Sequence, residues 1–338
     1  MMRLRHDIPV LLLHNLNPEW SSAERVKAAA VVETLAVALR GLGHPVASVP
    51  VVDSDLAARL APFPPRRWVV FNWCEELPGI NHGDAAVVTL LEERGYAYTG
   101  ATAEVLALSW RKATVKRLME NAGIPTPHWR LCENGFPESW SYFPAIVKPA
   151  CEHCSFGITP DAVVLSQQLL AARIAWIRRT FGQAALIEEF IDGREFHVSL
   201  WGNERLEVLP VAEMDFSCFA DLRERLCTYE AKFTPGSRHY EKIETLLPAP
   251  LAPAEAAALS DVCRRAYRAH GCRDYARMDV RLHNGIFYVL DVNPNPDFSP
   301  DASLVCAAET AGIPYGLMGS CLVNLAARRH SAFASELA

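Results

Sequence analysis

The chain of 338 residues lacks several features that would assign it to common classes of protein. No apolar run approaches the roughly 18–20 residues of a membrane-spanning helix, and the apolar stretch 8–13 is followed too soon by polar residues for a secretory signal. Basic residues are not in excess, since 33 lysines and arginines stand against 39 aspartates and glutamates. We therefore expect a cytoplasmic protein that binds neither a membrane nor nucleic acid.

Familiar cofactor and metal motifs are also absent. No GxGxxG follows an early strand, which argues against a two-domain dehydrogenase, and the loop after Lys148 has one glycine and no Walker pattern. The ten cysteines favour free, mostly buried thiols over a disulfide framework. Cys151 and Cys154 form a CxxC around His153, but no second ligand pair follows at zinc-site spacing. A metal or redox role there is the lesser alternative.

The length allows two or three domains. Over the first hundred residues apolar runs alternate with helical patterns, which predicts a parallel α/β sheet with crossover helices. The expected strands are 8–14, 46–49 and 68–72, and the expected helices are 21–40 and 84–94. Ser21 or Ser22 is a suitable N-cap for the first helix, with Glu24 in its opening turn, and the Gly-Leu-Gly at 41–43 can end it. Ligands of such sheets meet the loops after the strands, here 14–24 and 72–83.

The pattern changes after residue 110. A short helix over 111–123 is followed by two prolines, which mark a domain boundary just before that helix. Further along we expect strands at 145–149, 185–188, 196–201 and 205–214, a helix between the first two, a polar loop over 217–248 and a helix over 254–269. Two last strands, 275–282 and 286–292, flank Asn284-Gly285, which predicts a hairpin.

This hairpin carries a candidate metal site. Asp279 lies on one arm, and Asp291 and Asn293 lie on the other, so their oxygens can face one another. Such oxygens suit a hard cation such as Mg²⁺. Arg277 lies two residues before Asp279, on the same strand face, and can hold an anion beside the metal. Solvated or capping carboxylates are the alternative.

Three lysines lie where a nucleotide phosphate could meet them. Lys112 begins a helix, Lys148 closes a strand, and Lys232 lies in a polar loop. For each one alone, an ordinary surface lysine is the stronger interpretation.

The segment around residue 190 has the composition of an adenine pocket. Glu188, Glu189 and Glu195 flank the apolar Phe190 and Ile191, which suits an adenine slot with a carboxylate for the ribose. An ordinary strand, turn and strand would have a similar composition.

Nine segments of the chain follow one another in a recognisable order. They are 98–100 (Tyr-Thr-Gly), 110–119, 122–127 (Ala-Gly-Ile-Pro-Thr-Pro), 147–150 (Val-Lys-Pro-Ala), 155–158 (Ser-Phe-Gly-Ile), 188–196, 229–233 (Tyr-Glu-Ala-Lys-Phe), 275–279 (Tyr-Ala-Arg-Met-Asp) and 291–296 (Asp-Val-Asn-Pro-Asn-Pro). In this order they resemble the ATP-grasp ligases, and within them the D-alanine–D-alanine ligases, over nearly the whole chain. The resemblance implies a three-domain ATP-grasp fold with an N-terminal parallel α/β domain, divided at 1–108, 109–192 and 193–338.

The resemblance also implies an activity. ATP would phosphorylate a carboxylate, and an amine would attack the acyl phosphate to give an amide, ADP and phosphate. The substrates would be amino acids or amines, the cofactor Mg²⁺ or Mn²⁺, and the assembly a homodimer. By the same resemblance the triphosphate would be bound by Lys112, Lys148 and Lys232, adenine by Glu188, Glu189, Phe190 and Ile191, and ribose by Glu195. The metal would be bound by Asp279, Asp291 and Asn293, and the acyl phosphate by Arg277. Ser155 would belong to the loop that closes over the phosphates, and Glu24 would bind the substrate amine.

The chain departs from the family pattern on the amino-acid side. The phosphate loop has His153 where the family has glycine and Cys154 where it has serine. Phe233 replaces a tyrosine of the mobile loop, and Ser303 is the nearest candidate for contact with the second substrate's carboxylate. We therefore expect a more apolar pocket and substrates other than D-alanine, of unknown identity and chirality. A genuine D-alanine–D-alanine ligase and a non-catalytic nucleotide-binding protein are the alternatives.

Overall fold

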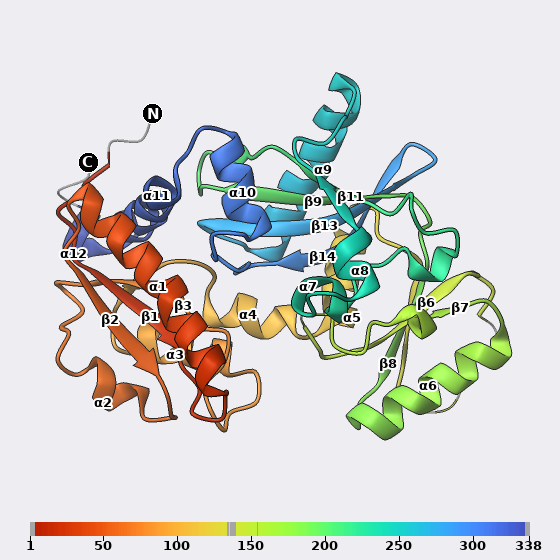
Figure 1. Cartoon of the computed structure of the whole chain (residues 1–338), viewed down its shortest axis with the longest axis horizontal. Coiled ribbons are helices and arrows are strands. Elements are labelled where there is room, and N and C mark those ends of the chain that lie inside the picture. The colour runs from red at the N-terminus through yellow and green to blue at the C-terminus, as the bar shows by residue number, and fades with distance from the viewer. Residues whose placement is uncertain (1–3, 134, 136–139, 154, 335–338) are drawn as a thin grey trace.

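The computed structural model describes residues 4–133, 135, 140–153 and 155–334, and it contains three β-sheets. The N-terminal sheet lies at one end of the molecule, the central sheet (129–189) lies at the other, and the C-terminal sheet (194–293) lies between them (Figure 1). This arrangement confirms the mixed α/β class. Within the described residues no helix combines the length and apolar character needed to cross a membrane.

Four parallel strands form the N-terminal sheet: β1 (Val10–Asn15), β2 (Val46–Val51), β3 (Val69–Trp73) and β4 (Ala97–Tyr98). Their order is β2-β1-β3-β4, as expected for crossover connections. The accompanying helices are α1 (Ser22–Leu42), α2 (Leu56–Leu60), α3 (Gly83–Glu93) and α4 (Ala103–Ser109). Ser21 caps α1 in a capping box with Glu24, and Gly43 ends it in the left-handed conformation, which confirms both predicted signals.

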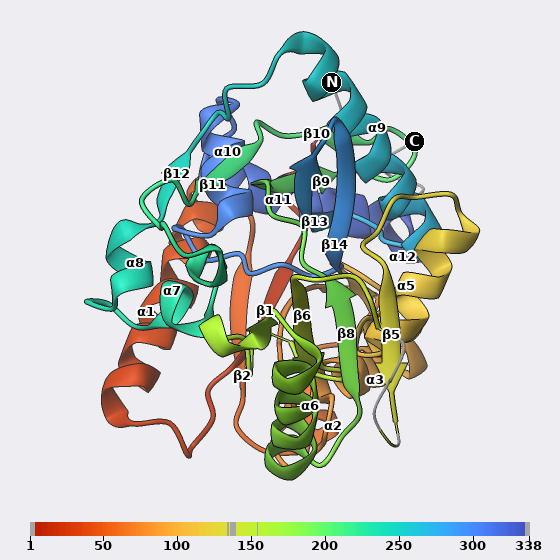
Figure 2. The same ribbon diagram turned by 90° about the vertical axis from the view of Figure 1, so that its right-hand side faces the viewer.

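The central sheet is antiparallel. Its strands are β5 (Trp129–Cys132), β6 (Ala145–Pro149), β7 (Val163–Val164) and β8 (Ala185–Glu189), in the order β5-β8-β6-β7. The helix α5 (Lys112–Asn121) precedes it, a 3-10 turn (Pro160–Ala162) precedes β7, and α6 (Gln167–Phe181) packs across β6 and β8 (Figure 2). Ser166 caps α6 and Gly182 ends it.

The C-terminal sheet holds the longest strands. They are β9 (Arg194–Trp201), β10 (Glu207–Val208), β11 (Ala212–Asp215), β12 (Glu244–Leu246), β13 (Tyr275–His283) and β14 (Ile286–Asn293). The order is β12-β11-β9-β13-β14, with β10 beside β9. The helix α9 (Pro253–His270) packs on β13 and β14. Asn284 and Gly285 both have positive φ, at 49° and 78°, so the predicted hairpin is confirmed.

The structure corrects two expectations in the region before α9. Residues 205–214, expected as one strand, form two, because Pro210 has no N–H to donate to a sheet. Residues 217–248, expected as a loop, contain a 3-10 turn (Leu222–Glu224), α7 (Tyr229–Phe233), α8 (Arg238–Lys242) and β12. Thr228 and Ser237 cap the two helices, a local signal that composition alone conceals.

The last helices, α10 (Ser303–Thr310), α11 (Tyr315–Arg328) and α12 (Ser331–Ala334), return to the beginning of the chain. The helix α11 packs on α1 and on β3 and β4 of the N-terminal sheet. Phe298 is fully buried between them, with its ring 5.1 Å from Phe71 and 5.3 Å from Tyr315. The N-terminal sheet and the C-terminal helices therefore share one core, while the predicted division at 108 and 192 stays a prediction.

Asp274 joins these distant segments. Its carboxylate is fully buried and accepts hydrogen bonds from the Gly100 N–H at 2.9 Å, from Asn203 Nδ2 at 2.9 Å and from Arg329 Nη2 at 2.8 Å. These partners follow β4, β9 and α11 respectively. A buried charge is costly unless it is paired. The folded chain is therefore stable only if these three segments stay in contact with Asp274.

We predict that Asp274→Asn lowers the free energy of unfolding by about 3–5 kcal/mol, because it leaves Arg329 without its buried charge partner. Asparagine keeps the shape and tolerates the positive φ of 63° at this position. Urea unfolding followed by fluorescence measures the change. The control is Asp221→Asn, which breaks an exposed pair with Arg223 and should cost less than about 1 kcal/mol. Equal losses in the two variants would contradict the role of Asp274.

Candidate active site

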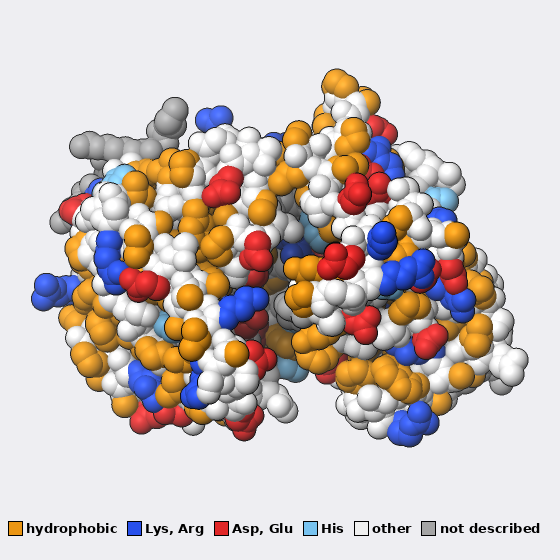
Figure 3. Space-filling model, viewed as in Figure 1, with side chains coloured by type: hydrophobic (Ala, Val, Ile, Leu, Met, Phe, Trp, Pro, Cys, Tyr) orange, Lys and Arg blue, Asp and Glu red, His pale blue; other side chains and the backbone are white. Residues whose placement is uncertain are grey.

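A cavity of about 990 Å³ lies between the three sheets. Figure 3 shows the corresponding hollow in the surface, between the two halves of the molecule. The predicted residues that line it are Glu24, Lys112, Lys148, Ser155, Glu188, Glu189, Phe190, Ile191, Glu195, Lys232, Arg277, Asp279, Asp291 and Asn293. Ser303, the first residue of α10, does not line it, whereas Ser299 does. Cys154 and the side chain of Phe233 lie outside the described part of the chain.

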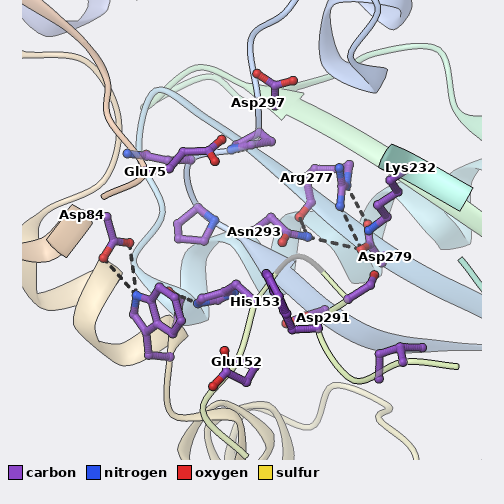
Figure 4. Close-up of a pocket in the computed structure, with 18 of the residues that line it drawn as sticks. Glu75, Asp84, Glu152, His153, Lys232, Arg277, Asp279, Asp291, Asn293 and Asp297 are labelled. Atoms are coloured by element: carbon purple, nitrogen blue, oxygen red, sulfur yellow. Dashed lines mark hydrogen bonds and ion pairs between the residues drawn. The ribbon is translucent and has the colours of Figure 1, made fainter. Parts of the chain in front are cut away.

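Two carboxylates face each other across the hairpin. Asp279 on β13 lies directly opposite Asp291 on β14. Arg277 holds Asp279 through two hydrogen bonds, of 2.7 Å from Nε and 3.1 Å from Nη2, and Lys112 Nζ lies 3.1 Å from Asp291 Oδ2. Asn293 donates to Asp279 Oδ2 at 3.3 Å. The five predicted groups therefore form two sets in contact, Arg277 and Asn293 on Asp279 and Lys112 on Asp291; Figure 4 shows the first set.

Cations hold both carboxylates in the charged state. Burial alone would raise the pKa of Asp291, but Lys112 lowers it well below its ordinary value. The pKa of Asp279 is likewise lowered, because Arg277 outweighs the effect of burial. Together with the amide oxygen of Asn293, these charged oxygens form the hard-donor set that Mg²⁺ or Mn²⁺ prefers.

Glu188 lies between two lysines in the interior. Its oxygens are 2.5 Å from Lys116 Nζ and 2.5 Å from Lys148 Nζ, and the residue is 1% exposed. Burial alone would raise its pKa, but the two lysines bring the pKa of Glu188 to about 2. Sequence reasoning overlooked Lys116. It follows Lys112 by four residues on one helical face, and that spacing is the signal that could have found it.

Glu195 is similarly held by an arginine that the sequence analysis missed. Arg281 Nε lies 2.7 Å from Glu195 Oε2, and its Nη1 donates to the backbone oxygen of Ile191 at 2.7 Å. The same guanidinium stacks over Phe190, 4.7 Å from the ring centroid. Arg281 continues the alternation of Arg277 and Asp279 along β13, so the period of two could have identified it.

Two described residues of the predicted phosphate loop, His153 and Ser155, have partners outside that loop. Ser155 has a positive φ of 61° and donates through Oγ to the backbone oxygen of Cys227 at 3.0 Å. The His153 ring meets Trp110 edge-on at 4.0 Å. Burial and the nearby Lys112 lower the pKa of His153 to about 4, so this histidine is neutral at pH 7.

Glu24 has a structural partner. Its Oε2 accepts a hydrogen bond of 2.7 Å from the Ser21 N–H in the capping box of α1, so the predicted amine-binding carboxylate also fixes a helix end. Four further carboxylates line the same side of the cavity: Glu75, Glu76, Asp84 and Asp297. Glu75 and Glu76 lie in the loop 72–83, which the sequence analysis expected to meet a ligand, but it did not single out these residues. Asp84 lies in the first turn of α3 and Asp297 in the loop after β14.

Comparisons with known proteins agree with this geometry. A family model described as D-ala D-ala ligase C-terminus matches residues 118–324. The uncharacterized protein y4sG of Sinorhizobium fredii is 35% identical over 268 residues, which are 78% of this chain and 75% of that protein. A D-alanine–D-alanine ligase of Desulforudis audaxviator is 32% identical over 253 residues, 73% of this chain and 78% of that one. The crystal structure of the D-alanine–D-alanine ligase from Bacillus anthracis complexed with ATP has the same fold, with a TM-score of 0.74 at 18% identity, covering 95% of this chain and 98% of that chain.

We predict that Lys116→Met destabilises the protein by about 3 kcal/mol at pH 7, because Glu188 loses one of its two buried partners. The pKa of Glu188 is lowered in the folded state, so the stabilisation is present above the ordinary value of 4.5 and fades as the pH falls toward about 2. Urea unfolding at pH 7 and pH 3 should therefore show a smaller difference between variant and wild type at pH 3. Lys242→Met, at an exposed lysine, is the control. A difference independent of pH would refute this assignment.

Proposed function

The chain belongs to the D-alanine–D-alanine ligase family of ATP-grasp enzymes, which are ATP-dependent, ADP-forming ligases, and on this premise we propose that it joins a carboxylate to an amine through an acyl phosphate. One observation carries the proposal: phosphate-binding cations and metal-binding oxygens gather in one cavity. They are Lys112, Lys148, Lys232, Arg277, Asp279, Asp291 and Asn293. Such a set suits phosphoryl transfer, which depends on positioning and on neutralising charge.

ATP binds, in this proposal, between the central and C-terminal sheets. Phe190, which is 5% exposed, and Ile191 provide an apolar slot for adenine, with Glu189 beside them. Glu195 holds the ribose. Both oxygens of Glu188 are occupied by lysines, so its role is to orient Lys148 toward the triphosphate. We further propose that units 1–108, 109–192 and 193–338 each supply one wall of the cavity, the first for the amino-acid or amine substrates.

Asp279, Asp291 and Asn293 would hold Mg²⁺ with the triphosphate. Directly opposed carboxylates repel each other on a sheet. Arg277 and Lys112 each pair with one of them, and both side chains stay partly exposed to the cavity, 17% for Asp279 and 32% for Asp291. The donor set therefore fits a divalent cation. When bound, it supplies charge neutralisation at the phosphate oxygens, so that a negatively charged carboxylate can approach.

The chemistry then takes two steps. A carboxylate oxygen attacks the γ-phosphorus, and the bond from that phosphorus to the bridging oxygen breaks, which releases ADP. The amine nitrogen next attacks the acyl carbon, phosphate leaves with the carbon–oxygen bond electrons, and the nitrogen gives up one proton. Arg277 stabilises the acyl phosphate and the oxyanion of the tetrahedral intermediate, where its planar fork can bind two oxygens.

The substrates proposed for this reaction differ from a pair of D-alanines. The support is the histidine at position 153, where the family has a glycine, and the acidic group at residues 75, 76, 84 and 297 that lines the substrate side. The expectation of a more apolar pocket rests on Cys154 and Phe233, whose side chains lie outside the described part of the chain, and it stays a prediction. The side lined by residues 75, 76, 84 and 297 is acidic.

We predict that ATP binds only weakly without a divalent cation and gains at least about tenfold in affinity with Mg²⁺, because the metal neutralises repulsion between the triphosphate and the two aspartates. Isothermal titration with and without Mg²⁺, using the full chain, measures this. Asp279→Asn should reduce the Mg²⁺ effect. Failure to bind ATP at saturating Mg²⁺ would overturn the proposed function.

We also predict that Arg277→Lys lowers turnover by about 100-fold or more, because lysine keeps the charge but loses the bidentate geometry. Release of ADP with ATP, Mg²⁺ and a mixture of amino acids and amines is the measurement. Arg205→Lys, at an arginine whose side chain is 87% exposed, is the matched control and should retain full activity. Wild-type turnover in Arg277→Lys would exclude the transition-state role.

A further inference from the structure

Three side chains that can bind a metal ion meet beside the C-terminal sheet. Glu195 and His197 lie two residues apart on β9 and therefore on the same face of that strand. Cys227 lies between the 3-10 turn and α7. One oxygen, one ring nitrogen and one sulfur atom of these residues all lie within 4.8 Å of one another. Because Glu195 and Cys227 line the cavity, an ion from solution can reach the cluster.

The distances within this cluster are those between ligands of an ion, and they are too long for hydrogen bonds. His197 Nε2 lies 3.7 Å from Glu195 Oε1 and 3.9 Å from Asp279 Oδ1. Two ligands bound to a tetrahedral ion at about 2.0–2.3 Å are themselves about 3.4–3.6 Å apart. A cation between the three side chains therefore requires only small side-chain shifts.

The protein leaves the buried groups of this cluster partly unpaired. Glu195 and His197 are 5% and 6% exposed. Arg281 Nε donates to Glu195 Oε2 at 2.7 Å, so that Oε1 is the oxygen nearer to His197. His197 Nδ1 is buried and has no hydrogen-bond partner among the described residues. Since buried polar groups are nearly always bonded, the position of this imidazole depends on what meets its Nε2.

The chemistry of the donors selects the kind of ion. Thiolate, imidazole and carboxylate together suit Zn²⁺, whereas Mg²⁺ prefers oxygen ligands alone. The cluster thus differs in chemistry from the hairpin set of Asp279, Asp291 and Asn293, although Asp279 adjoins both. Three protein ligands also leave a fourth position of a tetrahedral ion for water.

We propose that Glu195, His197 and Cys227 bind one zinc ion and that this ion excludes the nucleotide. The second part rests on the proposed function, in which Glu195 holds the ribose. On binding, the Cys227 thiol releases its proton to solvent, and the sulfur donates an electron pair to the metal. Glu195 Oε1 becomes a metal ligand and no longer accepts a hydrogen bond from the ribose. Zinc is therefore an inhibitor that acts at the nucleotide site.

Cobalt reports on the sulfur ligand directly, because a bond between Co²⁺ and a thiolate gives a charge-transfer absorption in the near ultraviolet. The full chain, free of metal and of ATP, is titrated first with Co²⁺ and then with Zn²⁺. We expect one equivalent of Co²⁺ to develop this absorption and Zn²⁺ to abolish it by displacement. Absence of the absorption at saturating Co²⁺ would overturn the site.

The variant Cys227→Ser locates the site. It should abolish the cobalt absorption and weaken Zn²⁺ binding at least about tenfold, because a serine hydroxyl does not supply a thiolate. His197→Asn should weaken Zn²⁺ binding similarly, and circular dichroism checks that both variants fold. Cys151→Ser, at a cysteine that is also half-buried, is the control and should bind both metals as the wild type does. Wild-type Zn²⁺ affinity in Cys227→Ser, or loss of the site in Cys151→Ser instead, would refute the assignment.

Isothermal titration with ATP tests the exclusion of the nucleotide. With Mg²⁺ in excess, one equivalent of Zn²⁺ should lower the apparent ATP affinity of the wild type at least about tenfold, and that of Cys227→Ser much less. Zinc bound by ATP itself in solution affects both proteins equally. An equal loss in the two proteins, or no loss in the wild type, would overturn the exclusion.

The two claims can fail separately. If the chain binds Zn²⁺ through Cys227 but binds no ATP with Mg²⁺, the metal site stands, while the proposed function and the exclusion fall. If ATP binds with Mg²⁺ and Co²⁺ gives no thiolate absorption, the proposed function stands and the zinc site falls.

Discussion

The rest of the site depends on the repulsion between two aspartates that face each other across one hairpin. Asp279 and Asp291 are directly opposite on β13 and β14, and their side chains are only partly exposed, 17% and 32% respectively. Such a pair persists only if cations surround it. Arg277 comes from the same strand, and Lys112 comes from the first turn of α5. Because Lys112 must lie against Asp291 to neutralise its charge, α5 lies against the C-terminal sheet. This arrangement encloses the cavity.

The same rule of paired buried charges extends outward from the hairpin. Glu188 is held by Lys116 and Lys148, from α5 and β6, and Glu195 is held by Arg281. In each case the acid has at least one cation in contact with it.

The features of the fold and the site that depend on neighbouring residues could be predicted from the sequence. The capping box at Ser21, the Asn284-Gly285 hairpin and the spacing of Arg277 and Asp279 each lie within a few residues, and the structure has all three. The helices inside 217–248 were missed because the composition is polar, although Thr228 and Ser237 cap them. The acidic residues on the substrate side could not be predicted as one group, because Asp297, in the loop after β14, reaches the segment between β3 and α3 only in the folded chain, where Trp73 donates to it at 3.2 Å. Likewise nothing in the order of segments shows that Glu188 would be shared by two lysines.

The most direct test of the central claim follows an oxygen atom. If the cavity activates a carboxylate as an acyl phosphate, one oxygen of that carboxylate must leave with the phosphate. A mixture of amino acids, D-alanine among them and every one labelled with ¹⁸O in its carboxyl group, is incubated with the protein, ATP and Mg²⁺, and the inorganic phosphate is analysed by mass spectrometry. The account predicts one ¹⁸O atom in each phosphate released with an amide. Amide formation with unlabelled phosphate, or with the label in AMP, would contradict it.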